Sequence, residues 1–345
     1  MSDTELLNAY VTPDDEAADV RHGSGTLRYI LKKAGGSVIS LFMVVMLGFF
    51  AFRVLPGDPV AVLTRGREVT AQQVADLRLE LGLDQPIWVQ FWHYLTGLFQ
   101  GDLGTSFVYH APVTQLIGEY LWPTVLLMSV SLVFTILIGV WAGQKAAWNR
   151  GGFFDNSSTT IALIFWSMPA FWLGLLLLLA FSGTGIFPSA GMVTAGSSAA
   201  GFALVWDVVR HLALPTVTLV AVSYAQYALV MRSSLLEEMN ADYLVTARAK
   251  GLPEDTVRRR HALPNALLPT VTIVFLQIAG LISGAVTVET VFSWPGLGFL
   301  TYQAIQGPDF PLLQGTFVVF SSIVILMNFV ADLVYRAIDP RVRAA

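Results

Sequence analysis

The chain has 345 residues, of which 54% are hydrophobic and only 13% are charged. A soluble domain carries about 25% charged residues, so this composition excludes an ordinary soluble protein. The chain has no cysteine, which excludes disulfides, zinc–thiolate sites and thiol chemistry, and its net charge of −4 gives no sign of nucleic-acid binding.

The chain opens with an acidic, polar segment over residues 1–27, which we predict to be a disordered cytosolic tail rather than a signal peptide. The remaining residues, 28–345, form one transmembrane domain. A helix needs about 20 mostly apolar residues to cross the bilayer core, and six segments meet that length. The sequence therefore predicts an all-α polytopic membrane protein with six transmembrane helices. The predicted spans are residues 36–55, 124–144, 159–181, 212–231, 267–287 and 315–335.

The longest segment between predicted spans covers residues 56–123. Val74, Leu77 and Leu81 recur there at helical spacing, which predicts a short helix over 71–81. Aromatic residues cluster in the second half of the segment, a pattern typical of a membrane-interface belt, with a ligand platform as the alternative. These aromatic residues are Trp88, Phe91, Trp92, Tyr94 and Phe99.

The basic residues indicate the orientation. If the N-terminus is cytosolic, 15 of the 20 lysines and arginines fall on the cytosolic side and 4 on the other, while Arg53 lies near the end of the first span. Cytosolic loops of membrane proteins carry such an excess of positive charge. We therefore predict that both termini are cytosolic, that 56–123 is a periplasmic or extracellular loop, and that 232–266 is a cytosolic loop.

The sequence lacks the common motifs of catalytic and cofactor sites. It contains no Gly-Lys dipeptide, hence no GxxxxGK[ST] phosphate loop, and it contains no GxGxxG fingerprint. Its five histidines are scattered without metal-ligand spacing. We predict no catalytic residue, no bound cofactor and no metal in this chain.

Ionisable residues are rare within the predicted spans. The candidates are Arg53 and Asp332, both near span ends, and we interpret Asp332 as a local helix partner of Arg336. Ion-driven carriers place such residues inside their helices as relays. The sequence therefore favours a conduit whose energy comes from elsewhere.

Two short helices are predicted within the cytosolic loop. The first covers residues 242–250, with Asp242 as its N-cap and Gly251 as its left-handed stop. A second helical stretch is predicted from Pro253 to the residue before Pro264. Such a protruding pair could bind a partner or lipid headgroups, and the chemistry alone leaves both alternatives open.

The pattern within this loop resembles the "EAA" loop of permease subunits in binding-protein-dependent ABC importers. That pattern is Glu-Ala-Ala, three residues, Gly, nine residues, Ile, any residue and Leu-Pro. The matching positions hold Val245, Thr246 and Ala247, then Gly251, then His261, then Leu263 and Pro264. The segment TARAKGL, followed by HALPNALLP, is similar to the corresponding loop of the dipeptide, oligopeptide and nickel permease subfamily.

Other segments resemble the same subfamily in the same order, over about residues 28–340. They are LPGDP at 55–59, LGLDQP at 81–86, GDLGTS at 101–106, ETVFSWPGLGFL at 289–300 and DFP at 309–311.

The resemblance implies a type I ABC importer permease fold, a multi-pass location in the bacterial plasma (inner) membrane, and a non-catalytic subunit of an ATP-hydrolysing complex. It implies that the loop at 243–264 couples the spans to a cytosolic ATPase. The ATPase-coupling residues would be Tyr243, Thr246, Ala247, Arg248, Ala249, Lys250, Gly251, Leu252, His261, Leu263 and Pro264.

The resemblance also implies the partners. They are a second homologous permease subunit forming a heterodimer, two ATPase subunits that bind ATP and Mg, an extracytoplasmic substrate-binding protein docked on 56–123 and 289–314, a peptide substrate and membrane lipid, with no nucleic acid. Short peptides are the expected substrate, with nickel, glutathione or a sugar as alternatives. A stand-alone secondary transporter or channel, or a membrane scaffold, are the alternative functions.

Overall fold

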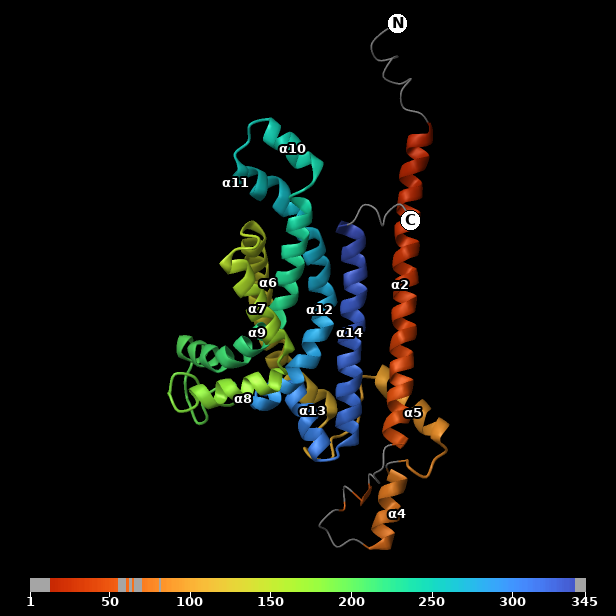
Figure 1. Ribbon diagram of the computed structural model, residues 1–345. Coiled ribbons are helices and arrows are strands. Elements are labelled where there is room, and N and C mark those ends of the chain that lie inside the picture. Colours follow the sequence, from red (N-terminus) through yellow and green to blue (C-terminus); the bar gives the residue numbers. More distant parts are fainter. Residues whose placement is uncertain (1–12, 55–59, 62–63, 65–69, 81, 339–345) are drawn as a thin grey trace.

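The structure, a computed structural model, describes residues 13–54, 60–61, 64, 70–80 and 82–338 (Figure 1). Regular structure within these ranges is helical, apart from one isolated bridge between Thr105 and Pro112. The helices are α2 (Pro13–Val54), α4 (Ala71–Glu80), α5 (Ile87–Phe99), α6 (Val113–Trp148), α7 (Phe153–Ser167), α8 (Ala170–Phe181), α9 (Phe202–Glu238), α10 (Asp242–Ala249), α11 (Glu254–Thr256), the π-helical segment η1 (Val257–Ala262), α12 (Leu263–Val291), α13 (Leu297–Gln306) and α14 (Phe310–Ile338).

Four helices in the described part of the chain are long and apolar enough to cross a membrane: Leu27–Arg53 of α2, all of α6 and α9, and Phe310–Val334 of α14. The bent pair α7 and α8 has the length and composition for a fifth. The predicted span 267–287 falls within α12, part of which lies outside the residues whose side chains are described. The predicted number of six spans therefore stays a prediction.

The predicted span 159–181 is not one straight helix. α7 and α8 meet at an angle of 103°, because Met168 and Pro169 leave the helical conformation with ψ angles of 134° and 133°. Proline clashes with a helical residue before it and has no N–H to continue the hydrogen-bond ladder. The apolar run on both sides of Pro169 conceals this break in the sequence.

α6 and α9 begin well before the predicted spans 124–144 and 212–231. α6 begins at Val113 and α9 at Phe202, and each keeps a proline inside, Pro123 and Pro215. Prolines are tolerated in membrane helices because neighbouring groups satisfy the backbone acceptors that they free.

The N-terminal segment and the long loop also differ from the predictions. Residues 13–27 are helical in α2, where the sequence predicts part of a disordered tail over 1–27, and residues 1–12 lie outside the described ranges. Within 56–123, α4 confirms the predicted short helix, apart from Leu81, which is outside the described residues; α5 was not predicted.

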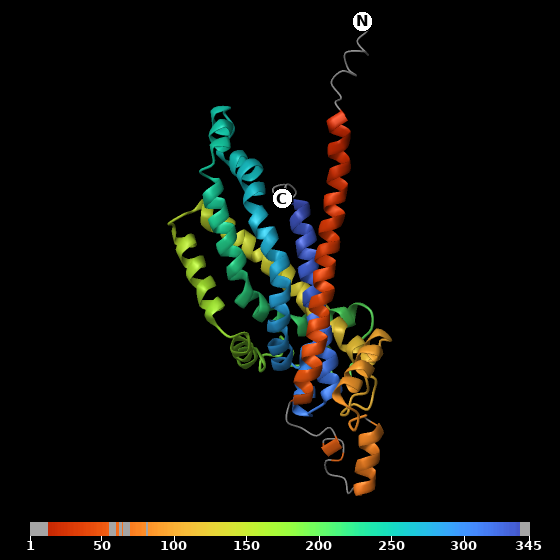
Figure 2. The ribbon, with the colours of Figure 1, turned by 90° about the vertical axis from the view of Figure 1, so that its right-hand side faces the viewer.

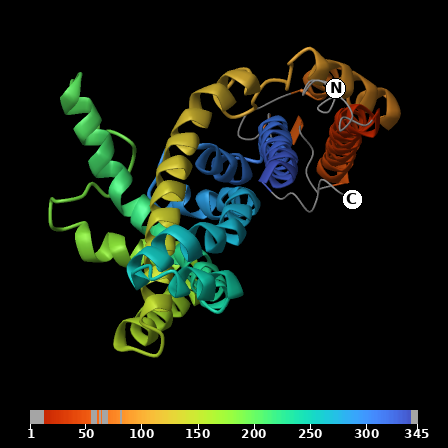
Figure 3. The same cartoon turned by 90° about the horizontal axis from the view of Figure 1, so that it is seen from above.

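The helices place two sets of connecting elements at opposite ends of the molecule. α10, α11, the N-terminal end of α2 and the C-terminal end of α14 lie at one end, which we call the α10 end. α4, α5 and α13 lie at the other, which we call the α13 end (Figures 1 and 2). From above, α2 and α14 stand side by side, away from α8 and the first turns of α9 (Figure 3).

α2 and α14 are joined by charge as well as by packing. Asp332, which we interpreted as a local partner of Arg336, has its carboxylate 2.8 Å from Lys33 Nζ of α2. The Arg336 guanidinium lies 4.4 Å from the ring centre of Tyr29, also on α2. These contacts hold the two helices together near the α10 end.

α6 and α9 approach each other unusually closely. A Cβ atom built on Gly143 would lie 2.4 Å from the Ala228 carbonyl oxygen, and one on Gly139 would lie 2.6 Å from Tyr227 Cβ. Glycines four residues apart let helix backbones meet in this way, as in the GxxxG motif of membrane helices. α6 and α9 therefore form the tightly packed centre of the domain.

Candidate functional site

α10 begins and ends within one residue of its predicted bounds. The N-cap is Ala241, so the prediction of Asp242 as N-cap is wrong: Asp242 lies in the first turn, where its charge favours the helix N-terminus without a side-chain cap bond. At the other end Gly251 has φ +77°. The N–H of Gly251 donates to the Arg248 carbonyl at 2.9 Å, and that of Leu252 donates to the Ala247 carbonyl at 3.4 Å. These bonds form a Schellman motif and confirm the predicted glycine stop.

The second helical stretch does not end before Pro264. It begins after Pro253 and runs through α11 and η1 directly into α12. Proline cannot donate a backbone bond, and in a regular α-helix its ring meets the carbonyl four residues earlier. Here the preceding turn widens, so that the Leu263 N–H donates to Arg258, five residues back. The π-helical turn thus lets Pro264 lie inside a continuous helix.

The inner face of α10 is packed against the membrane helices. Leu244 is fully buried and Ala247 is 8% exposed, both within one apolar cluster. Leu263 packs against the edge of that cluster. The cluster, which we call the loop core, consists of Ala147, Met231, Leu235, Leu244, Ala247, Val257, Ala262 and Ala266. The small side chain of Ala247 therefore fits the protein's own core rather than an outer surface.

The outer face of α10 and its turn is open. The side chains of Thr246, Ala249, Lys250 and Leu252 are exposed, as is Gly251, and Val245 is 59% exposed. This face combines small, polar and basic groups above an anchored core. It is a surface on which another protein could pack closely.

Tyr243 and His261 tie the loop to its neighbours. The Tyr243 hydroxyl donates to Glu238 Oε2 at 2.5 Å and accepts a bond of 2.9 Å from the Asn265 amide. The same amide lies 3.3 Å from the His261 carbonyl oxygen. Partial burial, together with the Glu238 carboxylate, raises the pKa of Tyr243. Tyr243 therefore joins α9, α10 and α12.

Arg248 is engaged inside the loop. Its guanidinium contacts both oxygens of Glu254, at 3.1 and 3.2 Å, and so bridges α10 to α11. The Arg248 charge holds the pKa of the Glu254 carboxyl below its usual range. The prediction placed Arg248 against a partner, whereas the structure gives it an internal carboxylate.

At the α13 end, the GDLGTS and DFP segments meet. The Ser106 hydroxyl donates to Asp309 Oδ2 at 2.5 Å, and the Val108 N–H donates to the same oxygen at 3.1 Å. Ser106 and Asp309 are both almost fully buried. Tyr109 bonds to Gln303 of α13 beside them. Two motifs about 200 residues apart in sequence therefore form one structural unit.

The ETVFSWPGLGFL segment folds around a buried acid. Glu289 is fully buried, and its Oε2 accepts the N–H groups of Gly298 and Phe299 at 2.7 and 3.2 Å. A Cβ on Gly296 would lie 2.3 Å from the Glu289 carboxyl carbon, so only glycine fits there. The indole of Trp294, fully buried, donates to the Pro123 carbonyl at 2.9 Å. The segment is a packed joint between α6, α12 and α13 rather than a simple surface turn.

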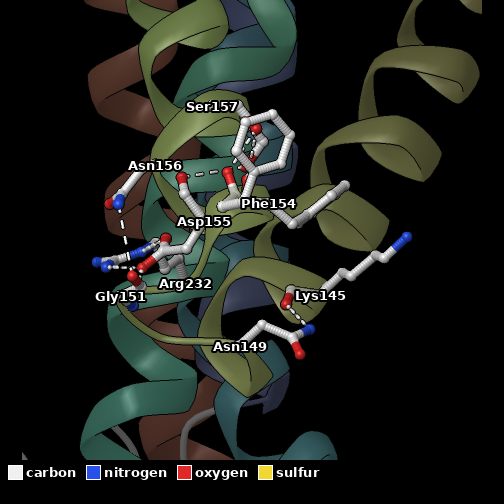
Figure 4. Close-up of polar contacts among 10 residues, drawn as sticks. Lys145, Asn149, Gly151, Phe154, Asp155, Asn156, Ser157 and Arg232 are labelled. Carbon is white, nitrogen blue, oxygen red and sulfur yellow. Dashed lines mark hydrogen bonds and ion pairs between the residues drawn. The ribbon is translucent and has the colours of Figure 1, made fainter.

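An ion pair that the sequence analysis missed lies nearer the α10 end. Arg232 of α9 contacts both carboxylate oxygens of Asp155, near the start of α7 (Figure 4). The two residues are 77 positions apart, and no local pattern relates them.

In the described ranges, no group of three or more histidine, aspartate or glutamate side chains could hold a metal ion.

Comparison with known proteins identifies relatives over nearly the whole chain. Residues 135–344 match the family described as binding-protein-dependent transport system inner membrane component, and residues 26–129 match the N-terminal component of the same system. The glutathione transport system permease protein GsiC of Salmonella typhimurium (strain LT2) is 40% identical over 318 residues, covering 92% of this chain and 99% of the relative. The dipeptide transport system permease protein DppB of Escherichia coli (strain K12) is 37% identical over 336 residues, with the same coverage.

A solved structure has a similar fold. In an inward-facing form of the MetNI methionine ABC transporter, a chain superposes with a TM-score of 0.53, covering 65% of this chain and 97% of its own length at 22% identity. A second crystal form gives a TM-score of 0.51. This likeness concerns the fold alone.

Proposed function

The chain belongs to the family of binding-protein-dependent transport system inner membrane components, and from that premise we propose that it forms, with a second homologous permease subunit, the path of an ATP-driven importer for short peptides. Members of this family are non-catalytic subunits in the inner membrane, working with ATPase and binding-protein partners. We therefore assign ATP and Mg to two partner ATPase subunits, and substrate delivery to an extracytoplasmic binding protein.

The substrate class follows from the named relatives. GsiC is described as a glutathione permease and DppB as a dipeptide permease, and both of these substrates are short peptides. Short peptides are therefore the proposed substrate, with glutathione among them and nickel or a sugar as the alternatives. Family membership gives no support to a stand-alone secondary transporter or channel.

The shape of the α10 end supports a coupling role for the loop. The exposed face of Thr246, Ala249, Lys250, Gly251 and Leu252 is the proposed ATPase contact. Closure of the ATPases around ATP would move this face, and the loop core would pass the movement to α6, α9 and α12. The observation that carries this proposal is an open, small-residue face on a firmly anchored loop.

The other predicted coupling residues act from inside the loop. Ala247 and Leu263 pack on the loop core, and Arg248 bridges α10 to α11. Tyr243 and His261 hold α10 against α12, and Pro264 lies in the continuous helix beyond. We propose that these residues set the position of the contact face.

The α13 end supports a docking role for the predicted outer segments. α13, the start of α6 and the start of α14 share one apolar cluster, which includes Val113, Leu297 and Leu312. We propose that this packed unit, within 56–123 and 289–314, is the platform for the binding protein.

The coupling proposal is tested with Ala249→Glu in the complete importer, using retention of the ATPase subunits through purification as the readout. We expect the variant to keep its own yield and thermal stability but to lose the ATPase subunits. Ala75→Glu is the matched control, an exposed alanine on α4 at the opposite end. Full ATPase retention by the Ala249 variant would overturn the assignment of the contact face.

A further inference from the structure

Building on the proposed function, we propose that Asp155 and Arg232 are positioning residues for transport, and that their ion pair makes α7 and α8 move with the coupling loop. The proposed function assigns coupling to the loop and its ATPase. This inference concerns how a helix that does not contribute to the loop core follows the loop's movement.

The pair is built as a rigid connection. Arg232 Nε lies 2.6 Å from Asp155 Oδ1, and Nη2 lies 2.8 Å from Oδ2 (Figure 4). The Gly151 N–H donates to the same Oδ2 at 2.9 Å. The Asp155 side chain is only 2% exposed and that of Arg232 is 29% exposed. A two-point contact between a planar guanidinium and a carboxylate fixes orientation as well as distance.

Arg232 lies on α9 among residues that contact α10. It follows Met231 and precedes Leu235 on α9, and both neighbours belong to the loop core that holds α10. The buried members of this core come from α6, α9, α10, η1 and α12, and none of them from α7. A shift of α10 therefore reaches Arg232 through contiguous packing, and the ion pair is the direct polar connection from there to α7.

The Phe154 ring of α7 packs edge-on against Trp141 of α6, but the contact of α7 around Arg232 is made mostly by small groups. Ser158, Thr159 and Ala162 of α7 face Gly143 of α6 and Ala228 of α9 around a void of about 10 Å³ that Arg232 also lines. Small side chains bury little apolar area, and in lipid the hydrophobic effect adds little to helix association. Directional polar contact is correspondingly more important for keeping α7 in register with α9.

α8, which follows α7, contacts the segment next to Glu289. After the bend at Pro169, α8 packs by Gly174 against Val291 and Phe292, with a Cβ built on that glycine 3.2 Å from each side chain. Val291 and Phe292 follow Glu289 by two and three residues. α7 and α8 therefore connect the Arg232 level of α9 with the α13 end of α12.

The test uses the complete importer in nanodiscs, with spin labels on introduced cysteines at Asn156 of α7 and Ser233 of α9, both exposed, in a chain that has no cysteine of its own. With the native pair, the distance between the labels should stay constant between the nucleotide-free and ATP-bound states. With Asp155→Asn, that distance should change between the two states, and peptide uptake per ATP hydrolysed should fall by at least about fivefold, as for loss of an ordinary coupling energy.

The double variant Asp155→Asn with Arg232→Gln should lower peptide uptake per ATP no further than either single variant does, because all three variants lack the same ion pair. Arg232→Lys keeps the charge but loses the two-point contact, and it provides the test if Asp155→Asn does not fold. Arg232→Lys should keep the ATPase subunits and basal ATP hydrolysis while lowering uptake per ATP.

The inference would be overturned if Asp155→Asn and Arg232→Lys kept both a constant distance between the labels and full peptide uptake per ATP. It would also be overturned if the loss of uptake in these variants only matched their loss of folded protein. If the native complex fails to retain its ATPase subunits or shows no ATP-dependent transport, the proposed function fails instead.

Discussion

The Thr124 hydroxyl donates a hydrogen bond of 2.7 Å to Glu289 and accepts one of 2.7 Å from the Leu297 N–H. A single side chain of α6 therefore connects the last turn of α12 to the first turn of α13. The Glu289 carboxylate is otherwise bonded to the N–H groups of α13, where negative charge is favoured by the helix dipole.

Thr124→Val should destabilise the folded chain by about 2–4 kcal/mol, since it leaves the buried Leu297 N–H and one Glu289 oxygen without their partner. Thermal unfolding in detergent would measure the loss. Thr135→Val on the same helix is the matched control: the Thr135 hydroxyl is fully buried with no hydrogen-bond partner in the described structure, so the change should be neutral or stabilising. Equal losses for both variants would contradict the role of Thr124.

The sequence predicted the helical membrane architecture because apolar length alone determines which segments can cross a bilayer. It located helix ends less well: the predicted spans begin at 124 and 212, whereas α6 and α9 begin at Val113 and Phe202 and keep Pro123 and Pro215 inside. The same residue type at 169 does break a helix. A single sequence does not distinguish these cases, because the outcome depends on neighbouring helices that supply substitute hydrogen bonds.

The first loop helix, α10, and its glycine stop were predicted from the sequence, whereas the contacts that the loop makes with the rest of the protein were not. Gly251 is a local signal for a helix stop, and it was read correctly. The inward direction of Ala247 and the pairing of Asp155 with Arg232 depend on contacts between distant parts of the chain, which no local spacing encodes. The Gly139 and Gly143 spacing was a signal in the sequence that could have indicated close helix packing.

Gly251→Val should weaken the proposed coupling, because a β-branched residue at φ +77° costs about 1–2 kcal/mol or adopts another conformation and moves the proposed contact face. We expect lower substrate-stimulated ATPase activity at normal protein yield. Gly251→Asn should retain more activity, since asparagine tolerates the left-handed region. Gly185→Val places the same strain, at φ +67°, in the segment between α8 and α9, and it should leave ATPase stimulation unchanged. Equal stimulation in the two valine variants would refute the prediction.

The Arg248–Glu254 bridge should make the loop sensitive to acid. The Arg248 guanidinium lowers the pKa of the Glu254 carboxyl below its ordinary value of 4.5. Because the folded pKa is the lower one, the bridge contributes fully at neutral pH, and its contribution is lost as the pH falls below 4.5 through the folded value. Hydrogen exchange of α10 amides, corrected for intrinsic rates, should be faster in Glu254→Gln than in wild type at pH 7, with the difference disappearing in acid.

The control for that experiment is Asp255→Asn. Asp255 pairs with Arg259 one turn along its own helical stretch, at 2.9 Å, and does not bridge to α10. Its replacement should leave α10 exchange unchanged at both pH values. A difference between wild type and Glu254→Gln that persists in acid would show that Glu254 acts through something other than its charge.

The contact of α6 with α9 gives the largest expected effect. Gly143→Val would place side-chain atoms against the Ala228 carbonyl and Met231 Cβ, where even a single Cβ would lie at 2.4 and 2.8 Å. The backbones would have to separate, which disrupts close packing along both helices and displaces Met231 from the loop core. We expect a loss of about 3 kcal/mol or more in folding stability, as for severe overpacking, measured by thermal unfolding in detergent. Gly118→Val is the control on the same helix, because nothing lies within 4 Å of a Cβ there. A helix-propensity effect alone would affect both variants equally, whereas a clash between helices would affect Gly143→Val and leave Gly118→Val close to wild type.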